Sequence, residues 1–209
     1  MSGLTSTGQR RRRADAQRSV AAILESAVAL LAVRPQASME EIARASGVAR
    51  QTVYAHFPSR GTLLRAVQER ALAEAVAAID AAELKKGPAV AALDRLVRAG
   101  WQTLERFPLL MEMRVGWTAE EELAHHQPIL ERLERLIRRG QRRGEFDRAL
   151  PVNWLLTSFL ALSHAAGEEV RAGRMSAETA LAALRQSVLR LFAATPTDAR
   201  GDEPNTDPK

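Results

Sequence analysis

The sequence predicts an all-α protein of about nine helices, in which a small three-helix domain precedes a larger helical domain. Two observations predict this class. Apolar residues recur at intervals of three and four positions in the long segments, which is typical of amphipathic helices. No segment alternates apolar and polar residues as half-buried strands do. Ser, Thr, Pro and Gly residues then mark where individual helices begin and end.

Composition narrows the class of protein. The chain has 209 residues, of which 46% are hydrophobic and 26% charged, and it contains no cysteine. Disulfide frameworks, thiolate zinc sites and cysteine nucleophiles are therefore excluded. The N-terminus lacks the apolar core of a secretory signal, and no uninterrupted apolar run reaches the roughly 18 residues of a membrane-spanning helix. We expect a soluble intracellular protein.

Positive charge is concentrated at the N-terminal end. Residues 1–70 hold 11 Lys/Arg against 5 Asp/Glu, a net charge of +6. Residues 71–209 hold 19 against 20, a net charge of −1. Such asymmetry predicts that the N-terminal part binds a polyanion.

The first segments form an arm and a packing helix. Residues 1–13 end in four consecutive arginines and are expected to be a disordered basic arm. That arm is interpreted either as a solubilising tail or as a contact to DNA phosphates or the minor groove. Apolar residues at helical spacing predict a helix from Asp15 to Val33, which Pro35 ends.

The stretch from Ser38 to Leu64 predicts a helix-turn-helix. Ser38 and Glu41 have the spacing of a capping box, and Gly47 suits the left-handed residue that ends a helix. The second helix, residues 48–56, is short and polar, so its side chains are expected to be exposed for contact, most simply in the major groove of DNA. Ser59 then caps a long helix that runs to about Leu84.

The remaining helices follow proline and capping signals. We expect a helix over 89–107, a short helix from Pro108, and a long one from Thr118 to Arg143 that Pro128 kinks or breaks. Two apolar helices follow over 151–171 and 177–194. Residues 196–209 are expected to be a disordered tail.

The segment from about Ala14 to Leu72 resembles the DNA-binding domain of the tetracycline-repressor (TetR) family of bacterial transcriptional regulators. The resemblance is carried by Met39-Glu40-Glu41-Ile42-Ala43, Gly47-Val48, Thr52-Val53-Tyr54, His56-Phe57, Pro58-Ser59-Arg60 and Leu63-Leu64. Gly61 departs from the acidic residue that the family more often has there, and Arg50-Gln51 occupy positions that the family varies. These departures bear on which operator is bound.

The resemblance implies a DNA-binding domain over 14–72 and an effector-binding and dimerisation domain over 73–195. It implies a cytoplasmic, nucleoid-associated bacterial regulator, most simply a repressor, that a small-molecule effector releases from a near-palindromic operator. The residues expected to contact double-stranded DNA are Ser38, Ala49, Arg50, Gln51, Thr52, Tyr54, His56 and Arg60. Arg50 suits guanine and Gln51 suits adenine, whereas the hydroxyls of Thr52 and Tyr54 suit phosphates. Ser38 and Arg60, each at a helix start, also suit phosphates.

The larger domain is expected to provide a dimer interface and a ligand cavity. The apolar faces of helices 151–171 and 177–194 are wide enough to pack against a second copy as a four-helix bundle, although they could be monomer core. A mixture of aromatic, thioether and imidazole groups suggests a small-molecule pocket, with ordinary core as the alternative. The candidate pocket residues are Trp101, Met111, Met113, Trp117, His125 and Trp154.

Catalysis and metal binding are the competing interpretations. Glu121 with His125, and His164 with Glu168, are four residues apart and could each place two metal ligands on one helix face, but neither pair has an evident third ligand. The sequence has no phosphate-binding glycine loop and no hydrolase motif. We therefore expect no enzyme activity and no cofactor. The alternative function is a ligand-binding or protein-interaction module that binds DNA without sequence specificity.

Overall fold

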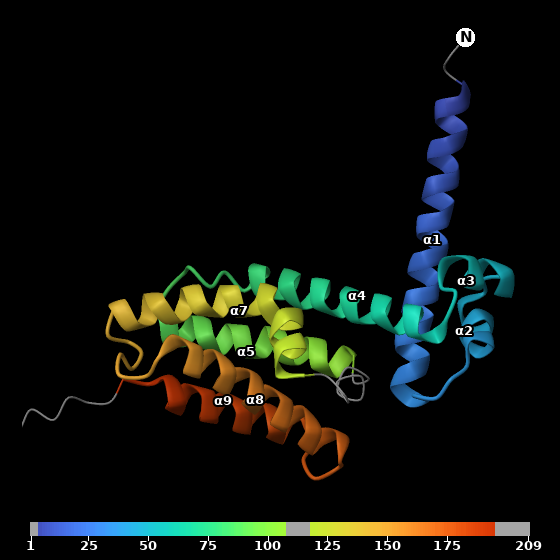
Figure 1. The fold of residues 1–209 in the computed structure, drawn as a ribbon. Helices are drawn as coiled ribbons and strands as arrows, with labels where there is room; N and C mark the ends of the chain where they lie inside the picture. The colour runs from blue at the N-terminus through green and yellow to red at the C-terminus, as the bar shows by residue number, and fades with distance from the viewer. Residues whose placement is uncertain (1–3, 108–117, 195–209) are drawn as a thin grey trace, which may run out of the picture.

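The computed structural model describes residues 4–107 and 118–194, and within these ranges the chain is helical (Figure 1). The N-terminal helices are α1 (Leu4–Val33), α2 (Met39–Ser46), α3 (Arg50–His56) and α4 (Arg60–Ala81). The larger part consists of α5 (Ala89–Arg106), α7 (Ala119–Arg142), α8 (Val152–Arg171) and α9 (Ala177–Phe192). The predicted all-α class is confirmed. The expected short helix from Pro108 and the tail over 196–209 lie outside the described residues.

Helix α1 is longer than the sequence analysis expected. A disordered arm was predicted over residues 1–13, but α1 already begins at Leu4, and its N-terminal half stands clear of the other helices (Figure 1). The physical reason is that residues 4–13 contain no proline and include four arginines, which favour helix. Extending an existing helix costs much less than nucleating one, so a stable C-terminal half can carry the helix outwards.

Residues 14–33 of α1 are also long and apolar enough to cross a membrane by length and composition, with a mean hydropathy of 1.5. This stretch is not an uninterrupted apolar run, because Glu25 and Ser26 interrupt it. Three residues of the same stretch, Ile23, Ala27 and Leu31, are buried against the neighbouring helices, and Glu25 forms ion pairs with arginines of α4 and α5. These contacts are those of a helix that packs in a protein core.

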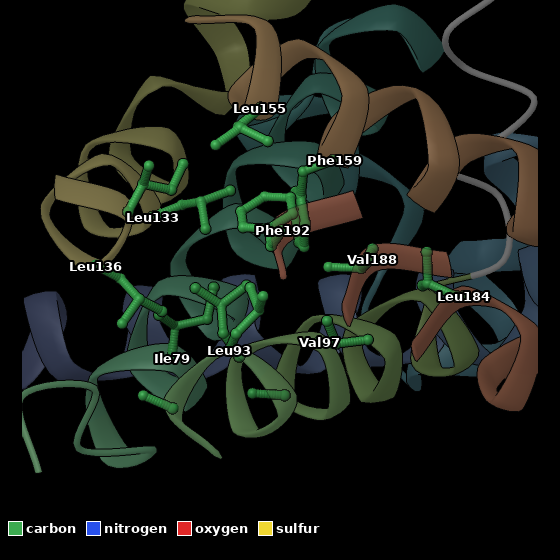
Figure 2. Packing of buried hydrophobic residues seen from close by; sticks show 14 of the residues in the cluster. Ile79, Leu93, Val97, Leu133, Leu136, Leu155, Phe159, Leu184, Val188 and Phe192 are labelled. Carbon is green, nitrogen blue, oxygen red and sulfur yellow. The ribbon is translucent and has the colours of Figure 1, made fainter. Parts of the chain in front are cut away.

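Two hydrophobic cores lie at the two ends of α4. The first joins α1, α2, α3 and the start of α4, where Leu63, Val67 and Ala71 are buried. The second is formed by the far end of α4 with α5, α7, α8 and α9 (Figure 2). Ile79 belongs to this second core, so the 22-residue α4 has buried residues in both cores.

Helix boundaries agree with the predicted signals. The Ser38 hydroxyl accepts the Glu41 backbone N–H, and the Glu41 carboxylate accepts the Ser38 backbone N–H, which is the predicted capping box. Thr118 and Glu121 form a second box at the start of α7. The sequence predicted that Pro128 kinks or breaks this helix. Helix α7 continues through Pro128, so the break does not occur.

Candidate nucleic-acid interface and ligand cavity

Helix α3 turns nearly all of its side chains outwards. Among its seven residues only Val53 is buried, at 0% exposure, because this residue packs into the N-terminal core with Phe57, which follows the helix. Gly47, with φ of 65°, makes the sharp turn from α2 that places α3 across it. The predicted DNA contacts Ala49, Arg50, Gln51 and Tyr54 are exposed, and Thr52 and His56 are partly exposed.

Arg50 is held in place by two neighbours. Its guanidinium lies 2.8 Å from the Glu40 carboxylate of α2, and it stacks over the Tyr54 ring at 5.5 Å from the ring centroid. Arg50 also lines an open groove between α2 and α3 together with Glu40 and Arg44. Arg44 is exposed at the C-terminal end of α2 and was not among the predicted contacts. Arg44 lies on the polar face of the helix before α3, and this pattern in the sequence could have identified it as a residue of the groove.

The two predicted phosphate-binding residues are engaged within the protein. The Ser38 hydroxyl takes part in the capping box. The Ser38 backbone N–H and, to a smaller extent, its hydroxyl donate to the Glu41 carboxylate and lower the pKa of that group. The Arg60 guanidinium donates to the backbone carbonyls of Pro35 and Ala37. In this conformation Arg60 therefore braces the loop before α2, and a contact to phosphate requires its side chain to turn.

A cavity of about 100 Å³ lies between α4, α5, α7 and α8, and Leu184 of α9 completes its lining. Its walls are mainly aliphatic, and the polar groups on them belong to Trp101, Thr103, Ser163 and a histidine cluster. The histidine cluster consists of His125, His126 and His164, with ring centroids 5.2 Å and 5.4 Å apart between successive members. Burial and, after it, electrostatic interaction with His126 lower the pKa of His125, so the neutral imidazole is favoured.

The structure brings two of the six predicted pocket residues to this cavity, Trp101 and His125. Met111, Met113 and Trp117 lie outside the described residues. Trp154 does not line the cavity and is 57% exposed, because the core face of α8 is the one that carries Leu155 and Phe159. Its assignment to the pocket is therefore corrected. His126 and His164 were missed as cavity residues; the signal available was that three of the four histidines lie on the helices that enclose it.

Trp101 separates this cavity from a second one of about 240 Å³. Both cavities are lined by Trp101 and Leu104, and the second also by Glu105. The Trp101 indole N–H donates to the Glu105 carboxylate at 2.9 Å, which fixes the orientation of the ring. Among the residues that the structure describes, no three His, Asp or Glu side chains come together as a metal site would require.

The end of α5 connects the cavity to the N-terminal core. Phe107, which caps α5, is 2% exposed and packs in the N-terminal core rather than in the larger one. Beside it, Arg106 pairs with Glu25 of α1 at 3.2 Å and with Glu74 of α4 at 3.3 Å. Helix α5, which also carries Trp101 and Thr103 in the cavity wall, is thus anchored to both α1 and α4.

Comparison with known proteins agrees with this arrangement. Residues 23–67 match the model for bacterial regulatory proteins of the tetR family. The chain is 34% identical over 159 residues to the HTH-type transcriptional repressor LfrR of Mycolicibacterium smegmatis, covering 75% of this chain and 82% of LfrR.

Solved structures show the same likeness. The crystal structure of LfrR in complex with proflavine matches with a TM-score of 0.62 and 28% identity, over 86% of this chain and 99% of that one. The TetR-family regulator PfmR of Thermus thermophilus matches with a TM-score of 0.64 and 28% identity, over 80% of this chain and 97% of PfmR. With its exposed α3, its basic N-terminal end and these relatives, the chain belongs to the tetR family of bacterial regulatory proteins and is a DNA-binding transcriptional regulator.

Proposed function

We propose that the protein is a homodimeric repressor that binds a near-palindromic operator through α3 and leaves it when a small ligand enters the larger domain. The observation that carries the first half is the exposure of α3, which buries Val53 alone. A helix with so little apolar surface buried is held there by its neighbours, and its polar side chains are available for base edges. The protein would act in the bacterial cytoplasm, at the nucleoid.

The dimer is proposed to form through α8 and α9. Trp154 of α8 exposes a large aromatic ring, and Met175, in the turn before α9, is 38% exposed. Exposed apolar side chains on α8 and in the turn that joins it to α9 favour a partner surface, and a second copy would complete a four-helix bundle. A two-fold dimer sets two α3 helices about one DNA turn apart, roughly 34–36 Å.

The cavity between α4, α5, α7 and α8 is proposed as the effector site. Its volume of about 100 Å³ is smaller than the roughly 300 Å³ at which small-molecule pockets usually begin. A ligand of ordinary size therefore has to move a wall, and displacement of Trp101 would join the cavity to its neighbour of about 240 Å³. A ligand that prefers the widened state shifts the protein towards that state.

The wall that moves is joined to the DNA-binding end. Trp101 lies on α5, and the end of α5 is anchored to α1 and α4 through Phe107 and the Arg106 ion pairs. A shift of α5 therefore strains the packing on which the orientation of α2 and α3 depends. Coupling between two sites requires a structural element whose position depends on both of them. The contacts of α5 with the cavity and with α1 and α4 support such coupling between the cavity and the DNA interface.

Proflavine is a suitable first probe, because LfrR has been crystallised with it. We would measure the fluorescence anisotropy of a bound DNA fragment, enriched from random sequence, as proflavine is added. Gly100 lines the cavity and a Cβ added there meets nothing within 4 Å, so Gly100→Val is the variant chosen to occupy part of the cavity. Val90→Ala on the outer face of α5 is the control.

The proposal predicts that proflavine releases DNA from the unmodified protein and from Val90→Ala but not from Gly100→Val, which still binds the fragment. If proflavine also releases DNA from Gly100→Val, the effector binds elsewhere. Ligand binding that leaves the DNA affinity unaltered would contradict the proposed mechanism.

A further inference from the structure

A further hollow, different from the two cavities on either side of Trp101, lies at the C-terminal end of α4. It has a volume of about 390 Å³ and is bounded by α7 and by the last turns of α4 with the loop that follows. Its floor includes Ile79 and Leu136, which are 1% and 3% exposed. Around this apolar floor stand five basic side chains: Lys85, Lys86, Arg132, Arg135 and Arg139.

Only part of this positive charge is balanced. Arg132 pairs with Asp80 through two hydrogen bonds of 2.7 Å, and Lys86 pairs with Glu83 at 2.6 Å. Within residues 4–107 and 118–194, the side chains of Lys85, Arg135 and Arg139 have no carboxylate within ion-pair distance. The five cations of the lining outnumber its two carboxylates, Asp80 and Glu83, and this excess over a low-dielectric floor concentrates a positive field in the hollow.

Arg139 is the group that most requires a partner. One of its terminal nitrogens donates to the Lys85 backbone carbonyl. Its Nε and its other terminal nitrogen are buried and have no hydrogen-bond partner in the described part of the protein. A guanidinium with two buried, unpaired donors is costly, and such a group is normally satisfied by a carboxylate, a phosphate or a bound water.

We propose that this hollow, which we name the Arg139 site, binds a small organic anion that carries at least two negative charges as phosphate or carboxylate groups. The anion's oxygens would accept hydrogen bonds from Arg139, after a small movement of its side chain, and would be attracted by Lys85 and Arg135. The volume lies within the range of small-ligand pockets, and planar guanidinium groups match phosphate and carboxylate oxygens in pairs.

DNA is not the partner that the Arg139 site fits. The site lies beyond the C-terminal end of α4, whereas α3 precedes the N-terminal end of that helix (Figure 1). With 22 residues and a rise of about 1.5 Å per residue, α4 separates the two by roughly 33 Å. A ligand here is therefore distinct both from the operator and from the occupant of the effector cavity.

The test is isothermal titration of the full chain, without DNA, using inorganic pyrophosphate and citrate as probes and sodium chloride at matched ionic strength as the blank. Arg139→Gln removes the buried donors. Lys85→Ala removes a cation but keeps the backbone carbonyl that Arg139 holds. Arg138→Gln is the matched control, because Arg138 is the neighbouring arginine of α7, pairs with Glu134 at 2.7 Å and does not line the hollow.

We expect saturable binding of at least one probe, weakened about tenfold or more in both Arg139→Gln and Lys85→Ala, and unchanged in Arg138→Gln. Binding of pyrophosphate alone would assign the site to phosphoryl groups, and binding of citrate alone to polycarboxylates. No heat above the chloride blank, or equal weakening in Arg138→Gln, would overturn the proposal. A circular-dichroism melt of each variant checks that it is folded. If Arg139→Gln does not fold, Lys85→Ala still tests the proposal.

Discussion

At the scale of single residues, we propose Arg50 as a side chain that discriminates between operators. It is exposed at the start of α3, and its ion pair with Glu40 and its stacking on Tyr54 hold the guanidinium in a limited set of positions. Such a side chain reaches a base edge with less loss of conformational freedom than an unrestrained arginine. Arg50 therefore serves as a test of base recognition by this helix.

If Arg50 contacts a base, Arg50→Ala should weaken binding to the preferred DNA by about 1–3 kcal/mol and relax the preference at one base-pair position. Binding titrations against a set of single-position DNA variants measure this. Loss by the same factor on every sequence would instead assign Arg50 to a phosphate. Gln51→Ala, at the adjacent exposed position, serves as the comparison variant.

His125 links the stability of the larger domain to pH. Its pKa is lowered in the folded protein by burial and by His126, and His164 completes the histidine cluster that packs around it. Below about pH 6.5, the ordinary pKa of histidine, the unfolded chain then binds more protons at this position than the folded one. The contribution of His125 to stability is therefore present above that pH and is lost as the pH falls below it.

Thermal unfolding between pH 5 and pH 7.5 should accordingly show a melting temperature that falls towards acid, and His125→Gln should flatten that slope. Ser163→Ala, which alters the same cavity wall without removing a titratable group, should keep the slope of the unmodified protein. Parallel slopes for His125→Gln and the unmodified protein would show that other groups cause the pH dependence.

At the scale of elements, the helix boundaries could be predicted because they depend on local chemistry. Ser38 with Glu41 and Thr118 with Glu121 satisfy backbone groups within one turn, so their spacing alone identifies two helix starts. The outward extension of α1 could not be predicted from its composition, since the same arginines suit a disordered arm and a helix. Trp154 was misassigned because a sequence does not show which face of an apolar helix meets the core.

Helix α7 contacts the turn that follows it unusually closely. A Cβ added at Gly140 would lie 2.2 Å from Cδ2 of Phe146, a ring that is 1% exposed and packs edge-on against Phe192 at 5.5 Å. The ring has no room to withdraw, so glycine is required here for packing rather than for backbone conformation.

Gly140→Ala should therefore lower the free energy of unfolding by about 1–3 kcal/mol, as overpacking of a core does. Gly100→Ala, also within a helix but facing open space, should leave stability unchanged or raise it by about 0.5–1 kcal/mol. Urea unfolding of the two variants makes the comparison. Similar losses for both would mean that Phe146 yields more easily than its burial indicates.

At the scale of the whole molecule, two copies of α3, one from each protomer, must act together to bind a palindromic site. In the proposed dimer the larger domain would provide the pairing. Helix α4 has buried residues in both cores, and α5, which packs in the larger core, is followed by Phe107 in the N-terminal core, so these two helices would carry a movement to the DNA-binding end. The fold class and the exposure of α3 could be predicted from sequence because they rest on short-range patterns. The cavity could be predicted only in part, because its walls come from five helices, α9 included, that are spread along the sequence.

The proposed dimer makes a direct prediction. Trp154→Glu places a charge on the exposed face of α8 and should convert the dimer to monomers in sedimentation experiments, with loss of tight DNA binding. Val90→Glu places the same charge at an exposed valine of α5 and should leave the dimer intact. A Trp154→Glu protein that stays dimeric would place the interface on another face.

The central claim is that the protein binds a defined DNA sequence, and selection of bound fragments from random DNA followed by sequencing tests it most directly. The account predicts enrichment of a near-palindromic sequence whose half-sites lie about one helical turn, roughly 10 base pairs, apart. A pool that remains random, while binding weakens steeply with salt, would contradict it and would favour a module that binds DNA only through its positive charge.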